Sequence, residues 1–104
     1  MPRPLGFTSL RILAAVRDGS AYGLDIVAHT GLPSGTVYPT LARLKSGGLV
    51  TARWEDQRHA EREGRPRRRY YELSAEGRKA LTEGLARAVQ ALAALHPASL
   101  GSAR

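Results

Sequence analysis

The sequence predicts a mainly α fold with a small β-hairpin, in the order helix, helix, helix, hairpin, helix. In four segments apolar residues recur every three or four positions, which is the period of an amphipathic helix. Two segments, near residues 50–55 and 69–73, alternate apolar and polar residues and so indicate half-buried strands. The short connection TGLPSG separates the second and third helices, as a helix-turn-helix requires. The expected fold class is therefore a winged helix-turn-helix with a further C-terminal helix.

The first third of the chain is expected to hold an arm and two helices. Residues 1–7 are assigned to a flexible N-terminal arm, and residues 8–18 to a helix with one apolar face. A turn follows, in which residues 20–22 are expected to form a very short strand. The second helix is predicted over residues 22–30, with Leu24 among the residues that face inward.

The third helix, about residues 34–46, has an unusual first turn. Val37, Leu41 and Leu44 share one face, and two glycines end the pattern. Pro39 lies near the front of this helix. If Ser34 is the N-cap, the proline removes a helical hydrogen bond, whereas with Thr36 as the N-cap its missing N–H costs little.

With either cap, the N-terminal end of this helix presents free amide groups, which favour phosphate. Small hydroxyls, a phenol and a guanidinium lie around that end and can donate to phosphates and base edges. This arrangement suits a helix that enters a major groove by its N-terminal end. The candidate contact residues are Ser34, Thr36, Tyr38, Pro39, Thr40 and Arg43.

The two strands most simply form a hairpin with a long basic loop over residues 57–67. Arginines in and next to this loop outnumber its two glutamates, so the hairpin can lie along a DNA backbone or reach a minor groove. Because neighbouring carboxylates would pair with some arginines, the expected contacts are restricted to Arg65, Arg67 and Arg68. Trp54 is expected to fill the core.

The last helix is predicted over residues 75–95, with Ser74 as its cap and His96-Pro97 after its end. Its apolar residues are spaced four and three apart, as in a heptad seam. Packing onto its own domain is one use of this stripe. We favour dimerisation, because a chain of this size has little core left to cover it. The predicted interface consists of Leu81, Leu85, Ala88, Val89, Leu92 and Leu95.

The predicted organisation is thus a winged helix-turn-helix over residues 8–73, with its wing at about 50–73, a C-terminal dimerisation helix at 74–96 and a disordered tail at 97–104. A dimer would place two recognition helices roughly 34–36 Å apart, which predicts a palindromic site on double-stranded DNA.

Composition narrows the function classes. Sixteen Lys and Arg against nine Asp and Glu give a formal net charge of +7, which suggests an anionic partner. The chain has no cysteine, so thiolate zinc sites and cysteine nucleophiles are excluded. Its three histidines are far apart and no phosphate-binding or nucleophile motif occurs, so we expect no enzyme activity, no cofactor and no metal. Without a signal peptide or membrane span, the expected location is cytoplasmic, at the nucleoid.

Two blocks resemble the PadR family of winged-helix transcription regulators. The stretch GTVYPTLARLKSGGLV is similar to the family pattern G-T-[LV]-Y-P-x-L-x-R-L-x-x-x-G-L-[IV], and GRPRRRYYELSAEG is similar to its second block, with one extra arginine before the tyrosines. The resemblance covers about residues 8–95. Lys45 and Ser46 stand where the family often has acidic residues. The single C-terminal helix is that of the family's short members.

This resemblance implies a homodimeric repressor that is relieved by a small-molecule inducer, whose identity the sequence does not give. The alternative from the residues themselves is a winged-helix module that binds protein or RNA without operator specificity.

Overall fold

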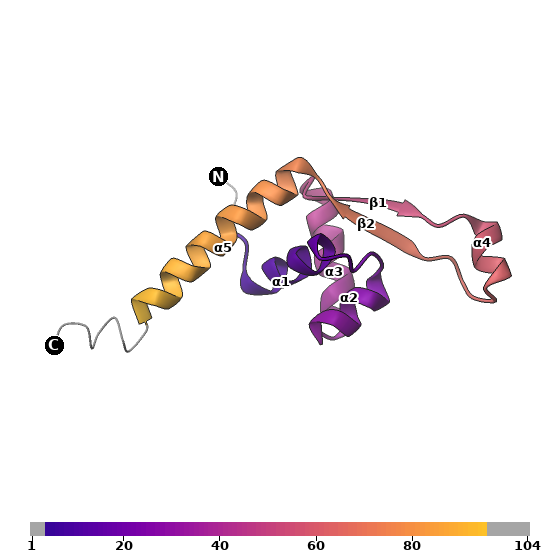
Figure 1. Ribbon diagram of the computed structural model, residues 1–104, viewed down its shortest axis with the longest axis horizontal. Helices are drawn as coiled ribbons and strands as arrows, with labels where there is room; N and C mark the ends of the chain where they lie inside the picture. Colours follow the sequence, from indigo (N-terminus) through magenta and orange to yellow (C-terminus); the bar gives the residue numbers. More distant parts are fainter. Residues whose placement is uncertain (1–3, 96–104) are drawn as a thin grey trace.

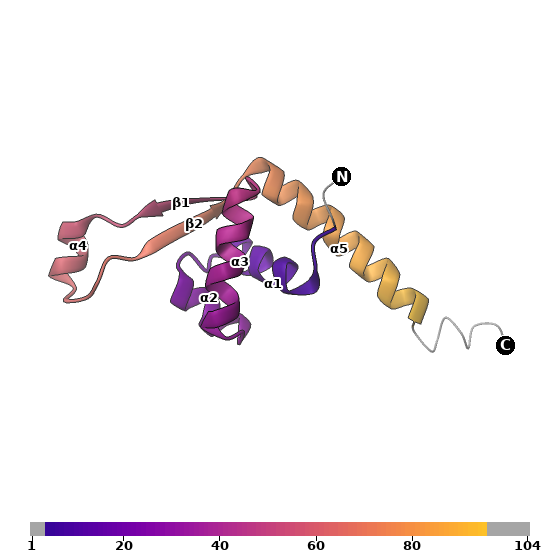
Figure 2. The same cartoon turned by 180° about the vertical axis from the view of Figure 1, so that it is seen from behind.

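The computed structural model describes residues 4–95 and shows a helical body with two long projections (Figure 1). The hairpin projects from one side of the body with a short helix at its tip, and the last helix extends from the other side (Figures 1 and 2). The elements are α1 (Phe7–Arg17), α2 (Gly23–Thr30), α3 (Ser34–Ser46), β1 (Val50–Trp54), α4 (Gln57–Arg62), β2 (Arg69–Leu73) and α5 (Ala75–Leu95). The predicted fold class is confirmed.

The core lies between the first three helices, the base of the hairpin and the first half of α5. α1 is its centre, because it contacts α2, α3, β2 and α5. Apolar residues on several sides of α1 are buried, which explains why its apolar stripe is wide. The buried cluster consists of Leu10, Ile12, Leu13, Ala15, Val16, Ile26, Val37, Leu41, Leu44, Val50 and Leu81.

The hairpin is antiparallel, with Val50 opposite Leu73 at its base and Trp54 opposite Arg69 at its outer end. The turn before α2 adds to it, because Tyr22 forms an isolated bridge with Tyr70, and the amide of Tyr71 donates to the carbonyl of Ala21 at 2.7 Å. The expected short extended segment before α2 is therefore present, and it fixes the wing to the helix-turn-helix.

Ser74 caps α5 as predicted. Its hydroxyl accepts a hydrogen bond from the amide of Gly77 at 2.9 Å and donates to the carbonyl of Gly48 at 2.6 Å. Gly77 packs so closely on the backbone of Leu49 that a Cβ would overlap it. The start of α5 is therefore fixed against the turn between α3 and β1.

Three expectations about the elements are wrong. The predicted loop at the hairpin tip contains α4, because Asp56 caps it through the amides of Arg58 and His59, and Ala60 is fully buried beneath it. Leu24 is 66% exposed, since Ile26 takes the buried position on α2. α1 begins at Phe7 after a Gly6 cap.

Within the predicted arm at residues 1–7, Phe7 belongs to α1 and Leu5 packs against the core. Residues 1–3, and the predictions for His96-Pro97 and the tail at 97–104, lie outside the described residues.

Neither predicted cap of α3 is used. The helix begins at Ser34, and the carbonyl of Pro33 accepts from the amides of Thr36 and Val37 at 2.9 and 3.0 Å. Pro39 is therefore the sixth helical residue, and it removes the bond that would go to the carbonyl of Gly35. Gly35 is exposed, so water can satisfy that carbonyl at small cost.

Candidate nucleic-acid interface

α3 has one buried face and one exposed face. Val37, Leu41 and Leu44 pack into the core, whereas Ser34, Tyr38 and Arg43 face solvent. No acidic residue occurs anywhere in this helix. Its first amides are partly unsatisfied by the helix itself, as at any helix N-terminus, so this end favours an anion. The exposed face is therefore suited to polyanionic DNA.

Thr40 does not belong to that face. It is 1% exposed, and its hydroxyl accepts a hydrogen bond from Nη2 of Arg43 at 3.2 Å. The prediction that Thr40 contacts DNA is therefore wrong for this structure, because Thr40 lies on the core side of α3, between Val37 and Leu41. Thr40 instead holds the exposed guanidinium of Arg43. Thr36 is half-buried and remains accessible in part.

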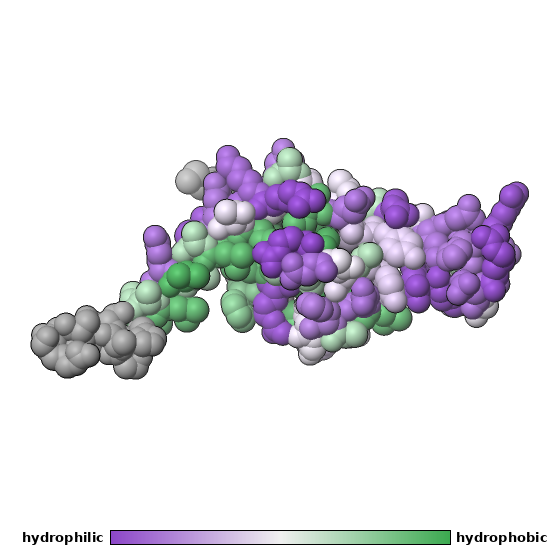
Figure 3. Space-filling model, viewed as in Figure 1, coloured by the Kyte–Doolittle hydropathy of each residue, from purple (hydrophilic) through white to green (hydrophobic). Residues whose placement is uncertain are grey.

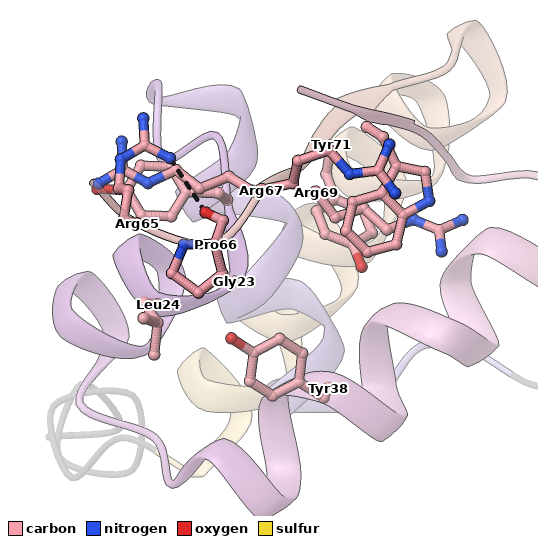
Figure 4. A pocket seen from close by; sticks show the side chains of 11 residues that line it. Gly23, Leu24, Tyr38, Arg65, Pro66, Arg67, Arg69 and Tyr71 are labelled. Carbon is pink, nitrogen blue, oxygen red and sulfur yellow. Dashed lines mark hydrogen bonds between the residues drawn. The ribbon is translucent and has the colours of Figure 1, made fainter. Parts of the chain in front are cut away.

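Tyr38 connects α3 to the start of α2. Its ring packs on Gly23 so closely that a Cβ at that position would overlap the ring. The side chain nevertheless stays 43% exposed. The absence of a side chain at Gly23 therefore decides where the Tyr38 hydroxyl points, which is toward Pro66 of the wing (Figure 4).

Glu55, directly after β1, organises the returning part of the wing. It is 5% exposed and accepts hydrogen bonds from Nη1 and Nη2 of Arg65 at 2.6 and 2.8 Å, from the amide of Arg68 at 3.1 Å and from the hydroxyl of Tyr70 at 3.2 Å. Nε2 of His59 lies 3.6 Å away. The hydrogen bonds from Arg65, which outweigh the effect of desolvation, lower the pKa of Glu55 to about 2.

Arg65 is therefore not a free cation. The bidentate bond to Glu55 raises its pKa and uses both terminal nitrogens. Arg65 is therefore less available for DNA than its position in the sequence suggests, because the carboxylate that binds it lies ten residues earlier. The two glutamates of the loop itself, Glu61 and Glu63, form no ion pair with an arginine within residues 4–95.

The next three arginines stack on aromatic rings instead. The guanidinium carbons of Arg67 and Arg69 lie 4.8 and 5.3 Å from the ring centre of Trp54, and that of Arg68 lies 4.0 Å from the ring centre of Tyr22. None of the three pairs with a carboxylate within residues 4–95. Stacking restricts a guanidinium while its N–H edge can still donate. Arg67 and Arg68 are thus held, but not neutralised.

Trp54 does not fill the core, contrary to expectation. It is 51% exposed, because the outer end of the hairpin projects beyond the helical body (Figure 1). Its ring serves as a platform for two arginines. The cross-strand pairing of Trp54 with Arg69 is the signal that could have shown this, but it depends on a register that the sequence alone leaves unset.

A cavity of about 350 Å³ lies between the wing and the helix-turn-helix (Figure 4). We call it the wing cavity. Rings from α3, β1, β2 and the turn before α2 line it, together with arginines from the returning wing. Its lining residues are Tyr22, Gly23, Leu24, Tyr38, Trp54, Arg65, Pro66, Arg67, Arg68, Arg69 and Tyr71.

The apolar stripe of α5 divides into two parts. Leu81 is 2% exposed and Ala88 packs against the core, so the predicted interface role of Leu81 is wrong: α1 already covers it. Leu85 is 37% exposed and Leu95 75% exposed. In Figure 3 the described second half of α5 shows apolar surface outside the body. The residues left uncovered are Leu85, Val89, Leu92 and Leu95.

No three histidine, aspartate or glutamate side chains gather into a possible metal site in the described part of the chain. Asp25 accepts from the amide of Ala21, and His59 faces Glu55. None of the helices within residues 4–95 is long and apolar enough to cross a membrane.

The comparisons with known proteins agree with this geometry. Residues 12–83 match the model of the transcriptional regulator PadR-like family. A PadR-like transcription factor from Bacteroides fragilis is similar in structure, with a TM-score of 0.70, 26% identity and 84% of each chain covered. No curated protein sequence is similar enough to count as a relative.

Two further solved structures share the fold. A PadR family transcription regulator from Clostridium difficile R20291 has a TM-score of 0.69 and 23% identity, and the match covers 86% of this chain and 97% of that one. BpsR of Bordetella bronchiseptica, whose DNA binding is regulated by 6-hydroxynicotinic acid, has a TM-score of 0.70 and 24% identity, with 98% of this chain and 76% of that one covered.

Proposed function

The chain belongs to the PadR-like family of transcriptional regulators, and from this membership we propose that it is a homodimeric repressor that binds a palindromic site on double-stranded DNA. The observation that carries the proposal is the exposed, acid-free face of α3 beside a wing whose Arg67 and Arg68 have no carboxylate partner within the described residues. Family membership makes it a regulator, and these two surfaces supply the DNA contacts.

In the proposed complex, α3 enters the major groove by its N-terminal end. Ser34, Thr36 and Tyr38 donate to phosphates or base edges there, and Pro39 shapes that turn. Arg43 lies one turn further along, and its hydrogen bond from Nη2 to Thr40 limits how it can turn. A guanidinium restrained in this way is suited to a guanine edge, which arginine reads with two hydrogen bonds.

The wing would follow the backbone. Arg67 and Arg68 lie on the returning segment before β2, and each is stacked on a ring that belongs to a different element. Because stacking already restricts these side chains, less conformational entropy is lost when they bind phosphate. Arg65 holds the wing through Glu55 and contributes indirectly.

The second copy of the chain would cover the outer half of α5. Leu85, Val89, Leu92 and Leu95 form an apolar stripe that residues 4–95 leave exposed, Leu85 in part and the other three for the most part. Two such helices packed together would bury this stripe and present two copies of α3 on one face of a DNA duplex, roughly 34–36 Å apart. This geometry is the reason for a palindromic site.

Repression, and its relief by a small molecule, follow from the family resemblance and complete the proposal. Regulation of DNA binding by a small molecule is known of BpsR, which shares this fold. A regulator of this kind would act on DNA in the cytoplasm, at the nucleoid.

The test is selection of binding sites from a random duplex library, with native mass measurement of the selected complex. We expect an enriched palindrome bound by two chains. Matched single-stranded RNA of the same length serves as the control ligand. Weak binding without enrichment, or equal binding to RNA, would contradict operator recognition and favour a module for RNA or protein.

A further inference from the structure

The wing cavity carries positive charge that nothing in the described protein neutralises. Its lining contains four arginines and no carboxylate. Glu55 pairs with Arg65, but Arg67, Arg68 and Arg69 have no acidic partner within residues 4–95. Arg67, Arg68 and Arg69 all line this one space between the wing and the helix-turn-helix, Arg67 and Arg69 on Trp54 and Arg68 on Tyr22. Such a space favours an anion.

One of these arginines has a buried donor without an acceptor. Nε of Arg69 is shielded from solvent and has no hydrogen-bond partner. Buried polar groups in folded proteins are nearly always paired, so an unpaired one calls for a missing partner such as an ion, a water or a ligand. Because Arg69 itself lines the wing cavity, an anionic oxygen there would supply the acceptor once the side chain turns toward it.

The same cavity has aromatic walls. Tyr22, Tyr38, Trp54 and Tyr71 come from different elements and line it together with the ring of Pro66. Planar groups are recognised by such rings and by guanidinium planes through stacking. The volume of about 350 Å³ lies at the lower end of the range of small-molecule sites.

We propose that the wing cavity is a binding site for a nucleoside monophosphate, whose phosphate binds Arg67, Arg68 and Arg69 and whose base lies against the aromatic walls. Charge decides for phosphate over carboxylate. A phosphomonoester carries about −1.5 to −2 near neutral pH and offers three acceptor oxygens, whereas a carboxylate carries only one charge. Three uncompensated guanidinium groups match the former.

Binding in this cavity would oppose DNA binding, a consequence that rests on the proposed function. Tyr38, Arg67 and Arg68 line the cavity and are also among the proposed DNA contacts. A nucleotide and a duplex would therefore compete for the same side chains. Because coupling between two ligands is reciprocal, each should weaken the other by the same factor.

Trp54 makes the site directly observable, since it is the sole tryptophan of the chain and lines the cavity. We would titrate the full chain, without DNA, with AMP or GMP and follow Trp54 fluorescence, with excitation where purines do not absorb. A saturable change is expected. Adenosine and inorganic phosphate should each bind at least about tenfold more weakly, because each lacks one half of the recognised group.

The variants separate the cavity from general charge. Arg69→Gln removes the unpaired Nε donor and should weaken AMP binding by about tenfold or more, since a hydrogen bond to a charged group is lost. Arg67→Gln, at an exposed position, gives a second measurement if Arg69→Gln disturbs folding. Arg62→Gln removes the same charge from α4, outside the cavity lining, and should leave AMP binding unchanged.

No saturable change with either nucleotide would overturn the proposal. Equal affinity for inorganic phosphate, or for benzoate, would overturn the nucleotide assignment in favour of a simple anion or a carboxylate. Competition is then measured with a fluorescein-labelled duplex of the selected sequence. Nucleotide binding without any duplex binding would refute the proposed function and leave the cavity site intact. Simultaneous binding of both would overturn the coupling.

Discussion

The wing contact can be tested by its contribution to the salt dependence of DNA binding. Arg67→Gln combined with Arg68→Gln removes the two stacked arginines that have no carboxylate partner and that we place on the backbone. Arg65 is left in place, because both of its terminal nitrogens already bind Glu55. The structure thus reduces the three contacts expected from the sequence to two.

The expected magnitude follows from counterion release. Each phosphate contact contributes about 0.9 to the slope of log affinity against log salt, so two lost contacts should flatten the slope by about 1.8. Between about 50 and about 200 mM salt, the double variant should therefore lose about tenfold less affinity than the original protein. Fluorescence anisotropy of a labelled duplex in a salt series measures both slopes.

A matched pair of charges on α5 serves as the control. Arg78→Gln with Lys79→Gln lowers the net charge by the same amount. Both residues are exposed on the first turns of α5, which begins beside the C-terminal end of α3 and not beside the N-terminal end that we place on DNA. The slope of log affinity against log salt should be the same for this control variant as for the original protein. An unaltered slope in the wing variant would remove Arg67 and Arg68 from the phosphate contacts. Equal flattening in the control would show that net charge alone is responsible.

Three further changes probe other parts of the molecule. Leu85→Asp with Leu92→Asp should give monomers that bind the selected duplex far more weakly, as native mass measurement and anisotropy would show; dimers that persist would place the interface elsewhere. The pKa of Glu55 is lowered on folding. Its stabilising contribution is therefore fully present above the ordinary glutamate pKa of 4.5 and is lost as the pH falls toward about 2. Glu55→Gln should therefore reduce the melting temperature near neutral pH and flatten its acid dependence, and identical pH profiles would refute this. Gly23→Ala should displace the Tyr38 ring and weaken DNA binding at least about tenfold while the chain stays folded by circular dichroism; unchanged affinity would exclude Tyr38 from the interface.

Leu81 and Leu95 show which features of α5 the apolar spacing predicts and which it does not. Both belong to one heptad stripe, and the spacing predicted the helix through its last residue. The spacing could not show that α1 covers the first part of the stripe and leaves the second part exposed. That division depends on where α1 lies across α5, at the close approach of Gly84 to Leu10, far apart in sequence.

The short helix at the wing tip was missed for a local reason. Its six residues are polar apart from Ala60, so they give no apolar period. The available signal was Asp56, an N-cap residue with free amides two and three positions later. One buried alanine and one cap are too little for a sequence pattern, but they suffice beneath a folded hairpin.

The sequence by itself determined the order of the main elements, the cap of α5, the Val37, Leu41 and Leu44 face of α3 and the family. These features follow from periods, caps and motifs that act over a few residues. Only the tertiary structure decided which polar and aromatic side chains are free. In the folded chain Thr40 is buried, Arg65 pairs with Glu55, and Trp54 lines the wing cavity instead of the core. The physical reason is that exposure and ion pairing depend on which residues, distant in sequence, come into contact. The strand register and the helix crossings determine those contacts.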